Sequence, residues 1–207
     1  TVEEQFKKIT TRIVNLEEGR FATEAELAEI KAAGLDPQKY DQRKASKTPE
    51  LSKPLSGDED PASIKRMEKY AEIYMIEKDG EIEKIILPIH GYGLWSTLYG
   101  FIALKGDMDT IVGLGFYSHA ETPGLGGEVD NPKWKALWPG KEVYDDGQVA
   151  IELIKGSVDA STRNAENKVD GLSGATLTSR GVSNLVQFWM GDNGYKLFLK
   201  NLRAGEA

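Results

Sequence analysis

Two runs of strand-forming residues around an Asp-Gly pair constrain the fold of this chain more than any other feature of its sequence. Residues 70–76 and 82–89 are rich in aliphatic, β-branched and aromatic residues, and Asp79-Gly80 between them is typical of a tight hairpin turn. A second pair of strands is predicted over 99–104 and 110–117, joined by a Gly-Asp-Met-Asp turn. The middle third of the chain therefore predicts antiparallel strands.

Helical patterns lie on both sides of these strands. Residues 23–33 predict a helix that begins with a Thr23/Glu26 capping box, and a long amphipathic helix is predicted over 175–190. The buried side of the long helix is predicted to hold Leu177, Val182, Leu185, Val186 and Trp189. Shorter helices are predicted over 2–8, 132–138 and 195–202, and further strands over 10–16 and 149–154. This order indicates an α+β fold, an antiparallel sheet flanked by helices.

The composition of the chain changes near residue 62. Residues 36–61 are rich in Lys, Pro, Ser, Asp and Glu, which predicts an irregular segment that crosses the surface. We expect residues 1–62 to form an N-terminal extension of helix, strand and helix that packs on a core domain of residues 63–207. A length of 207 residues suits one domain with such an extension.

Charge and residue usage exclude several classes of protein. A net charge of −7 argues against binding to nucleic acids or to anionic membrane surfaces. The chain has no cysteine, which excludes disulfides, zinc–thiolate sites and protein-held iron–sulfur clusters. Its two histidines, His90 and His119, are far apart in the sequence, so no metal site is expected and each is predicted to hydrogen-bond locally.

The segment 170–179, DGLSGATLTS, leads directly into the long amphipathic helix. The first N–H groups of a helix have no intrahelical partners and carry the positive end of its dipole, so they suit a phosphate. Ser173 is predicted as the N-cap, Gly174 allows a close approach, and Thr176 and Thr178 place two hydroxyls in the first turn. The alternative interpretation is that Ser173 only caps the helix and Gly174 only eases a turn.

The motif Asp170-Gly-Leu-Ser-Gly-Ala-Thr176 resembles the flavinylation motif of the FMN-binding domain family. In that family a flavin transferase joins the FMN phosphate to the hydroxyl of the closing threonine. Segments 40–44 (YDQRK), 86–96 (ILPIHGYGLWS) and 121–128 (ETPGLGGE) are similar to the C subunits of Na⁺-translocating NADH:quinone reductases. The G subunits of Rnf electron-transport complexes share only the first motif and the ETPGLG piece. The resemblance implies covalent FMN on Thr176 through a phosphoester.

The resemblance also implies a set of flavin-lining residues. They are Trp95, Glu121, Thr122, Leu125, Lys155, Ser173, Gly174, Ala175, Leu177 and Thr178. Taken from the residues alone, the default interpretation of Trp95 is a core aromatic, that of Lys155 is a solvated strand-end lysine and that of the 121–128 loop is a turn. Arg180 lies one helical turn after Thr176 and could also serve a phosphate. Tyr92 and Tyr99 are expected to be structural, and Asp170 is expected to matter to the transferase rather than to the finished protein.

By resemblance, the chain is an electron-transfer subunit of a membrane complex that oxidises NADH, reduces a quinone and expels Na⁺. The domain would face the periplasm at a bacterial inner membrane, and the intact protein would have an N-terminal membrane helix. No NADH fingerprint is visible, so electrons would pass between partner subunits, and the isolated domain would have no turnover. Two alternatives are the flavin subunit of an Rnf-type complex and a non-enzymatic periplasmic flavin-binding or sensory module.

Overall fold

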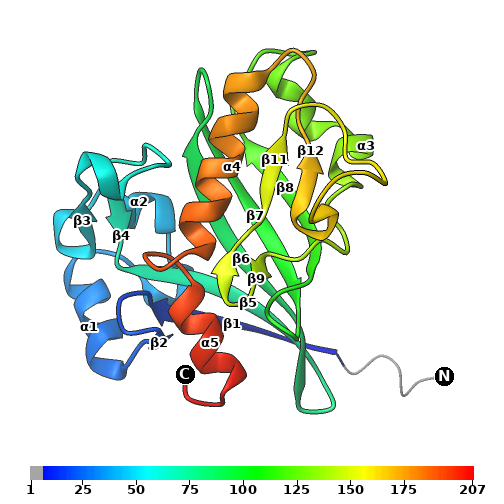
Figure 1. Ribbon diagram of the computed structural model, residues 1–207. Helices are drawn as coiled ribbons and strands as arrows, with labels where there is room; N and C mark the ends of the chain where they lie inside the picture. The colour runs from blue at the N-terminus through cyan, green and yellow to red at the C-terminus, as the bar shows by residue number, and fades with distance from the viewer. Residues whose placement is uncertain (1–6) are drawn as a thin grey trace.

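The computed structural model describes residues 7–207, which are built around a six-stranded antiparallel sheet (Figure 1). In their order across the sheet, the strands are β2 (Arg20–Phe21), β1 (Lys7–Asn15), β5 (Tyr70–Lys78), β6 (Glu81–Tyr92), β7 (Thr97–Lys105) and β8 (Ile111–Ser118). The predicted hairpin is confirmed as β5 and β6, with Asp79 at φ 55° and Gly80 at φ 79°, as a two-residue primed turn requires. The predicted α+β fold is also confirmed.

The strand predicted over 10–16 is confirmed as β1, which pairs along the whole length of β5. The helix predicted over 2–8 is wrong at residues 7 and 8, because these begin β1 and pair with Lys78 and Glu77. The rest of that predicted helix, residues 1–6, lies outside the described residues. Pairing with a strand more than 60 positions away along the chain overrides the local helical preference.

One face of the sheet is covered by α4 (Thr176–Met190), which packs mainly on β6 (Figure 1). The predicted burial of Val182, Leu185, Val186 and Trp189 is confirmed, since none is more than 1% exposed. The predicted burial of Leu177 is wrong, because this side chain is 51% exposed. Leu177 lies on the exposed side of the first turn of the helix, and the buried residue of that turn is Thr178, which is 2% exposed.

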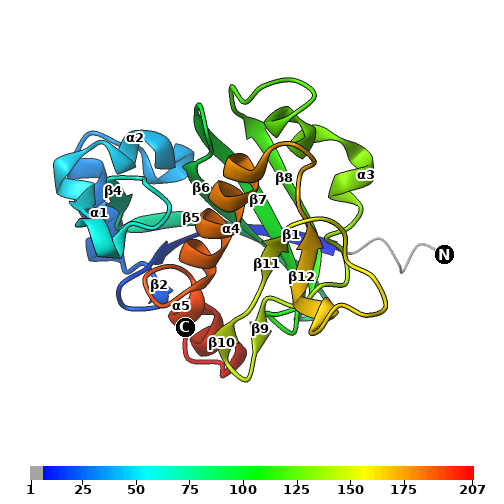
Figure 2. The same cartoon turned by 45° about the horizontal axis from the view of Figure 1, so that its top comes forward.

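Smaller elements flank α4 on two sides (Figure 2). One flank contains α1 (Glu24–Ala32), α2 (Gln42–Ser46), β3 (Ser52–Pro54) and β4 (Arg66–Glu68). The other flank contains α3 (Pro132–Lys135) and the parallel pair β11 (Glu152–Ile154) and β12 (Lys168–Asp170). The hairpin of β9 (Tyr144–Asp145) and β10 (Gln148–Val149) and the C-terminal α5 (Lys196–Arg203) complete the fold. α4 therefore separates the N-terminal flank, which contains α1 and α2, from the flank that contains α3, β11 and β12.

The single strand predicted over 149–154 is divided in the structure into β10 and β11. The division occurs because the N–H groups of Ala150 and Ile151 both donate to the carbonyl of Val143, at 2.8 and 3.1 Å. The helix predicted over 132–138 is present but ends at Lys135, and the helix predicted over 195–202 is confirmed as α5.

The prediction that residues 36–61 are irregular is wrong. The segment forms α2, β3 and the 3₁₀ helices Pro37–Lys39, Pro49–Leu51 and Gly57–Glu59. Aspartate side chains cap two of the helices: Asp36 accepts from the N–H of Gln38 at 2.9 Å, and Asp41 accepts from the N–H of Lys44 at 3.0 Å. The Pro and Asp residues that suggest a loop therefore begin short helices.

The N-terminal residues bury a small hydrophobic cluster of their own. Its members are Ile13, Ile30, Leu35, Tyr40, Ala45, Leu51 and Tyr70. The predicted capping box of α1 is confirmed: the Glu26 N–H donates to Thr23 Oγ1 at 3.2 Å, and the Thr23 N–H donates to Glu26 Oε1 at 2.9 Å. This cluster shares Ile13 and Tyr70 with strands of the main sheet, so the N-terminal segment is anchored to it.

Candidate functional site

The threonine of the Ser-Gly-Ala-Thr motif begins α4. Thr176 is exposed, and the N-cap is Ala175, whose backbone lies at φ −129° and ψ 56° and which offers no side-chain cap. The prediction that Ser173 caps the helix is wrong, because Ser173 lies two positions before the N-cap, in a turn completed by Gly174 at φ 70°. The positive end of α4 is therefore not capped by a side chain of its own motif.

Ser179 holds the motif in this conformation, a role that the sequence pattern does not reveal. Its Oγ accepts from the N–H of Leu172 at 2.9 Å and donates to the carbonyl of Ala175 at 3.0 Å. The N–H of Ala175 also donates to the carbonyl of Leu172 at 3.1 Å. These bonds close the turn immediately before Thr176, so the position of its hydroxyl is fixed by a residue one turn further along the helix.

Asp170 has a structural role in the folded chain, which the sequence pattern does not reveal either. Its carboxylate accepts from the N–H of Val158 at 2.8 Å, and its carbonyl accepts from the indole N–H of Trp134 at 3.0 Å. The next residue, Gly171, donates its N–H to the carbonyl of Gly156 at 3.1 Å. The start of the motif is thus bound to the loop that follows Lys155.

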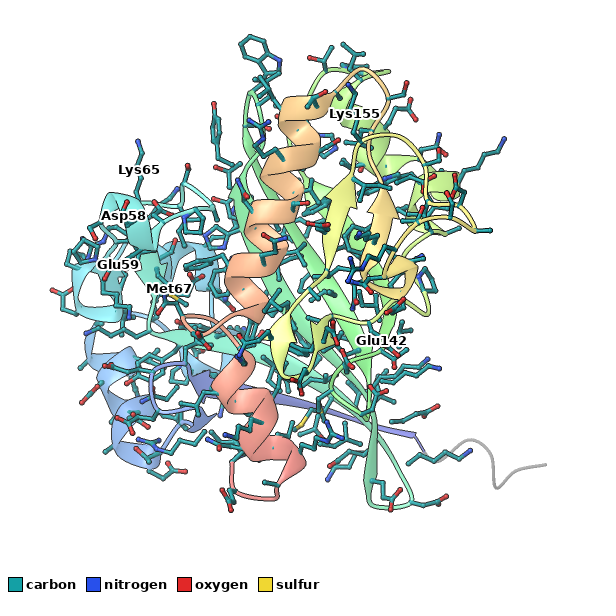
Figure 3. All side chains as sticks on the ribbon, viewed as in Figure 1. Asp58, Glu59, Lys65, Met67, Glu142 and Lys155 are labelled. Carbon is teal, nitrogen blue, oxygen red and sulfur yellow. The ribbon has the colours of Figure 1, made fainter. Side chains whose placement is uncertain are left out.

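A cavity of about 750 Å³ lies between this loop and α4. Thr176 lines it together with Ser173 and Gly174, and its cations are Lys155 and Arg180, against the single carboxylate of Glu152. Figure 3 shows Lys155 beside the N-terminal end of α4. The cavity therefore combines an exposed hydroxyl, the positive end of a helix and two basic side chains, a combination that suits a phosphate.

On the other side of the first turn of α4, Glu121 binds four donors from two segments. Its Oε1 accepts from the N–H of Leu94 at 2.7 Å and from Thr178 Oγ1 at 2.9 Å. Its Oε2 accepts from the N–H of Trp95 at 3.0 Å and from Ser96 Oγ at 2.8 Å. Glu121 is 5% exposed, so this carboxylate joins the 94–96 loop to α4 inside the protein.

The hydrogen bonds determine the charge state of Glu121. Burial by itself would raise the pKa of the carboxyl, but the donors from Leu94, Ser96, Thr178 and Trp95 outweigh it and hold the pKa below its ordinary value. His119 supports the same loop, since its Nδ1 accepts from the N–H of Glu121 at 3.1 Å and its Nε2 lies 2.8 Å from Asp130. Glu121 is therefore a carboxylate at neutral pH.

Three large apolar side chains are exposed around these groups. Trp95 is 66% exposed, Leu125 is 44% exposed and Leu177 is 51% exposed. A Cβ atom built on Gly174 would lie 3.3 Å from Leu125, which places this leucine beside the motif. The interpretation of Trp95 as a core residue is wrong. Exposed indole and leucine side chains in one region can cover a flat ring.

Comparison with known proteins identifies the family. Residues 93–191 match a family model described as the FMN-binding domain. The C subunit of the Na⁺-translocating NADH-quinone reductase of Pseudomonas aeruginosa is 56% identical over 201 residues, which cover 97% of this chain and 73% of that protein. This chain belongs to the NqrC family, the C subunits of these reductases. The relative from Yersinia pestis is 44% identical over 200 residues, covering 96% of this chain and 70% of that protein.

Solved structures of NqrC proteins have the same fold. The crystal structure of NqrC from Shewanella oneidensis superposes with a TM-score of 0.81 at 35% identity, covering 95% of this chain and 84% of that chain. The C subunit from Parabacteroides distasonis gives a TM-score of 0.65 at 27% identity, covering 92% of this chain and 77% of that chain. The resemblance to these C subunits, which the sequence motifs indicate, is confirmed.

The predicted lining residues of this NqrC-family chain fall into two groups. Lys155, Ser173, Gly174 and Thr176 line the cavity described above. The others lie outside its lining, around Glu121 or in the first turn of α4: Trp95, Glu121, Thr122, Leu125, Ala175, Leu177 and Thr178. All of these residues lie within the matched FMN-binding region.

No group of three His, Asp or Glu side chains suited to a metal ion occurs within the described residues. Of the two histidines, His119 forms local hydrogen bonds as predicted, whereas His90 lies inside β6 and is 8% exposed. None of the helices within residues 7–207 is long and apolar enough to cross a membrane.

Proposed function

We propose that this chain carries FMN joined covalently to Thr176 through a phosphoester, and that it transfers electrons as the C subunit of a Na⁺-translocating NADH:quinone reductase. The observation that carries the proposal is the exposed Thr176 hydroxyl at the uncapped start of α4, in a cavity with Lys155 and Arg180. Membership of the NqrC family supports the assignment to the complex.

The residues of the site fit the phosphate of FMN. A phosphate joined to Thr176 would lie near the first N–H groups of α4 and within reach of the basic side chains of Lys155 and Arg180. Gly174 leaves room for its approach, Ser173 lines the same cavity, and Ala175 is the N-cap of the helix that begins at Thr176. The opposite charges meet in a cavity that is open to solvent, so the cations offset the charge of the phosphate without requiring a buried ion pair.

Two threonines of the first turn could accept the flavin, and their surroundings separate them. Thr178 is 2% exposed and donates its hydroxyl proton to Glu121, so it is both covered and engaged. Thr176 is exposed. A transferase must reach the hydroxyl that reacts, which supports Thr176 as the attachment site and assigns Thr178 to positioning.

The exposed apolar side chains fit the ring system. Trp95, Leu125 and Leu177 would contact the isoalloxazine ring, and Glu121 would hold the loop of Trp95 in place through its hydrogen bonds. Thr122 lies at the turn that presents Leu125, since its carbonyl accepts from the N–H of Leu125 at 3.1 Å. FMN, when bound, supplies one- and two-electron transfer, and the protein supplies its position and surroundings.

We place the core domain, residues 63–207, at the periplasmic face of a bacterial inner membrane, where an N-terminal helix of the intact protein would hold it. Electrons would arrive from and leave to neighbouring subunits of a complex that oxidises NADH, reduces quinone and pumps Na⁺. Maturation requires a flavin transferase, because a phosphoester to an unactivated hydroxyl does not form spontaneously.

The intact mass of the denatured protein tests the attachment. The Thr176 oxygen forms a bond to the flavin phosphorus, one P–O bond of the flavin donor breaks, and the displaced oxygen substituent and the hydroxyl proton are released, so the mass gain equals FMN minus water. We expect this gain only when a flavin transferase is present, and we expect it to be lost in Thr176→Ala and kept in Thr178→Ser. Absence of a gain with active transferase, or a gain that survives Thr176→Ala, would refute attachment at Thr176.

A further inference from the structure

A second cavity of about 750 Å³ lies on the opposite flank of α4 from the flavin site. Its walls come from the end of α2, from the 63–66 loop and from the facing ends of β6 and β7. None of its lining residues lines the first cavity. α4 separates the two, since a Cβ atom built on Gly181 would lie 2.5 Å from the carbonyl oxygen of Tyr92. The proposed flavin site therefore does not account for this cavity.

The charge of the second cavity opposes that of the chain. Lys47, Lys65 and Arg66 line it, and its lining includes no carboxylate, in a protein with a net charge of −7. Arg66 is held in place because its Nε and Nη2 donate to the hydroxyl and the carbonyl of Ser52, at 3.0 and 3.2 Å. Figure 3 shows Lys65 rising from the top of the N-terminal flank. Such a cluster favours an anion.

A buried histidine without a hydrogen-bond partner forms part of the wall. His90 is 8% exposed and stacks on Tyr99 with ring centroids 5.3 Å apart, yet no partner for either ring nitrogen is found within residues 7–207. Burial, and then the charge of Arg43, lower its pKa to about 4. The imidazole is therefore neutral at pH 7, with one N–H to donate. Neither ring nitrogen is among the fully covered polar atoms without a partner, so the ring is accessible from the cavity that it lines, where an anionic ligand can accept its N–H.

The loop that carries Lys65 is held in an unusual conformation. Ser63 and Lys65 have φ values of 52° and 66°, in the left-handed region that residues with a Cβ atom rarely adopt. The carboxylate of Asp60 fixes this loop by accepting from the N–H groups of Ile64 and Lys65, both at 2.8 Å. Both left-handed residues line the cavity. Backbone strain of this kind concentrates at ligand sites, where the surrounding structure maintains it.

We propose that this cavity binds a small phosphate monoester that carries a planar ring, of the size of a nucleoside monophosphate. Its volume lies within the usual range of small-ligand sites. The three cations and the His90 N–H would bind the phosphate oxygens, and Tyr92, whose side chain is 42% exposed at the rim, would contact the ring. The proposal does not depend on covalent FMN at Thr176.

Ligand binding here would be detected at the flavin site. Tyr92 and Thr97 both line the second cavity and are paired across the end of the β6–β7 hairpin. The loop between them carries Trp95, whose N–H is bound by Glu121. A ligand that contacts Tyr92 and Thr97 would therefore change the surroundings of Trp95. A ligand that contacts His90 would also change the surroundings of Trp189, whose ring centroid lies 5.2 Å from that of His90, so tryptophan fluorescence reports binding.

The test is a calorimetric titration of the 207-residue chain with adenosine monophosphate at low ionic strength, with adenosine as the ligand that lacks the phosphate. We expect adenosine monophosphate to bind at least about tenfold more tightly than adenosine and to change the tryptophan fluorescence. The double variant Lys47→Gln/Lys65→Asn should weaken binding by roughly tenfold or more, since it removes two phosphate contacts. Asparagine at position 65 tolerates the left-handed backbone, and both lysines are exposed, so this variant should fold.

Two control variants locate the binding site. Lys31→Gln/Lys53→Gln removes the same charge from exposed positions outside the cavity and should bind like the unmodified protein. Lys155→Gln removes a cation of the first cavity and should also leave binding unchanged. No binding at millimolar adenosine monophosphate, equal loss in the Lys31/Lys53 variant, or loss in Lys155→Gln would overturn the proposal. None of these outcomes depends on the flavinylation of Thr176.

Discussion

Replacing Glu121 with glutamine tests the network that joins the Trp95 loop to α4, the helix that begins at Thr176. Each oxygen of the Glu121 carboxylate accepts one backbone N–H and one hydroxyl: Leu94 and Thr178 on Oε1, and Trp95 and Ser96 on Oε2. A glutamine side chain keeps the shape but presents an NH₂ group to one of these pairs. The hydroxyl of that pair can rotate and accept, whereas the backbone N–H cannot.

The expected loss of stability follows from this count. One backbone N–H loses its partner at a site that is 5% exposed, which costs about 1–3 kcal/mol, and the remaining bonds lose the strengthening effect of the charge. We expect Glu121→Gln to lower the free energy of unfolding by about 2–4 kcal/mol at pH 7. For a chain of 207 residues this corresponds to a fall in Tm of roughly 5–10 °C.

Urea unfolding, monitored by circular dichroism, measures the loss of stability in Glu121→Gln. The yield of flavinylated protein measures the effect of the substitution on the proposed site. Glu17→Gln is the matched control, since it removes the same charge at an exposed position. The pKa of Glu121 lies below its ordinary 4.5 in the folded chain, so its stabilisation is complete above pH 4.5 and is lost as the pH falls through the folded value. Equal stability of Glu121→Gln and Glu17→Gln at pH 7 would refute the reasoning.

Two further predictions concern the core. Burial raises the pKa of Glu68 from 4.5 to about 7, and Glu68 Oε1 has no hydrogen-bond partner within the described residues, so stability should fall as the pH rises from 4.5 to 7. We expect the free energy of unfolding of Glu68→Gln, relative to that of the unmodified protein, to be about 2–3 kcal/mol higher at pH 8 than at pH 4.5, as measured by urea unfolding at both pH values. The same difference between the two proteins at both pH values would contradict this. Gly181→Ala should lower stability by about 2–4 kcal/mol, because its Cβ would lie 2.5 Å from the Tyr92 carbonyl oxygen, whereas Gly113→Ala, with nothing within 4 Å, should have little effect. Equal unfolding midpoints for the two alanine variants would contradict the close packing of α4 on the hairpin.

The parts of the fold that the sequence predicts correctly are those specified by local patterns. The β5–β6 hairpin follows from two strand-forming runs and an Asp-Gly turn, and α1 follows from its capping box. The errors occur where distant contacts decide. Lys7 and Lys8 are strand residues because they pair with β5. Residues 36–61 are ordered because Tyr40, Ala45 and Leu51 are buried in one cluster with the distant residues Ile13 and Tyr70.

The candidate site shows the same division. The Ser-Gly-Ala-Thr motif is visible as a local pattern, and its threonine does begin a helix. The position of Glu121 could not be derived in this way, since its partners lie 27 and 57 positions away along the chain. Burial of Trp95 was also undecidable, because an indole in a hairpin loop is covered or exposed according to what packs on that loop.

The two threonines of the motif explain how a hydroxyl can be both free to react and fixed in space. Residues two apart on a helix point to different sides, so when Thr178 faces inward to Glu121, Thr176 must face the cavity. Ser179 closes the turn before the helix, and Glu121 holds the turn after it. Thr176 needs no hydrogen bond of its own to be positioned, and its oxygen remains free to react, as the proposed attachment requires. The spacing Thr-x-Thr-Ser is therefore as important to the site as the threonine that we propose is modified.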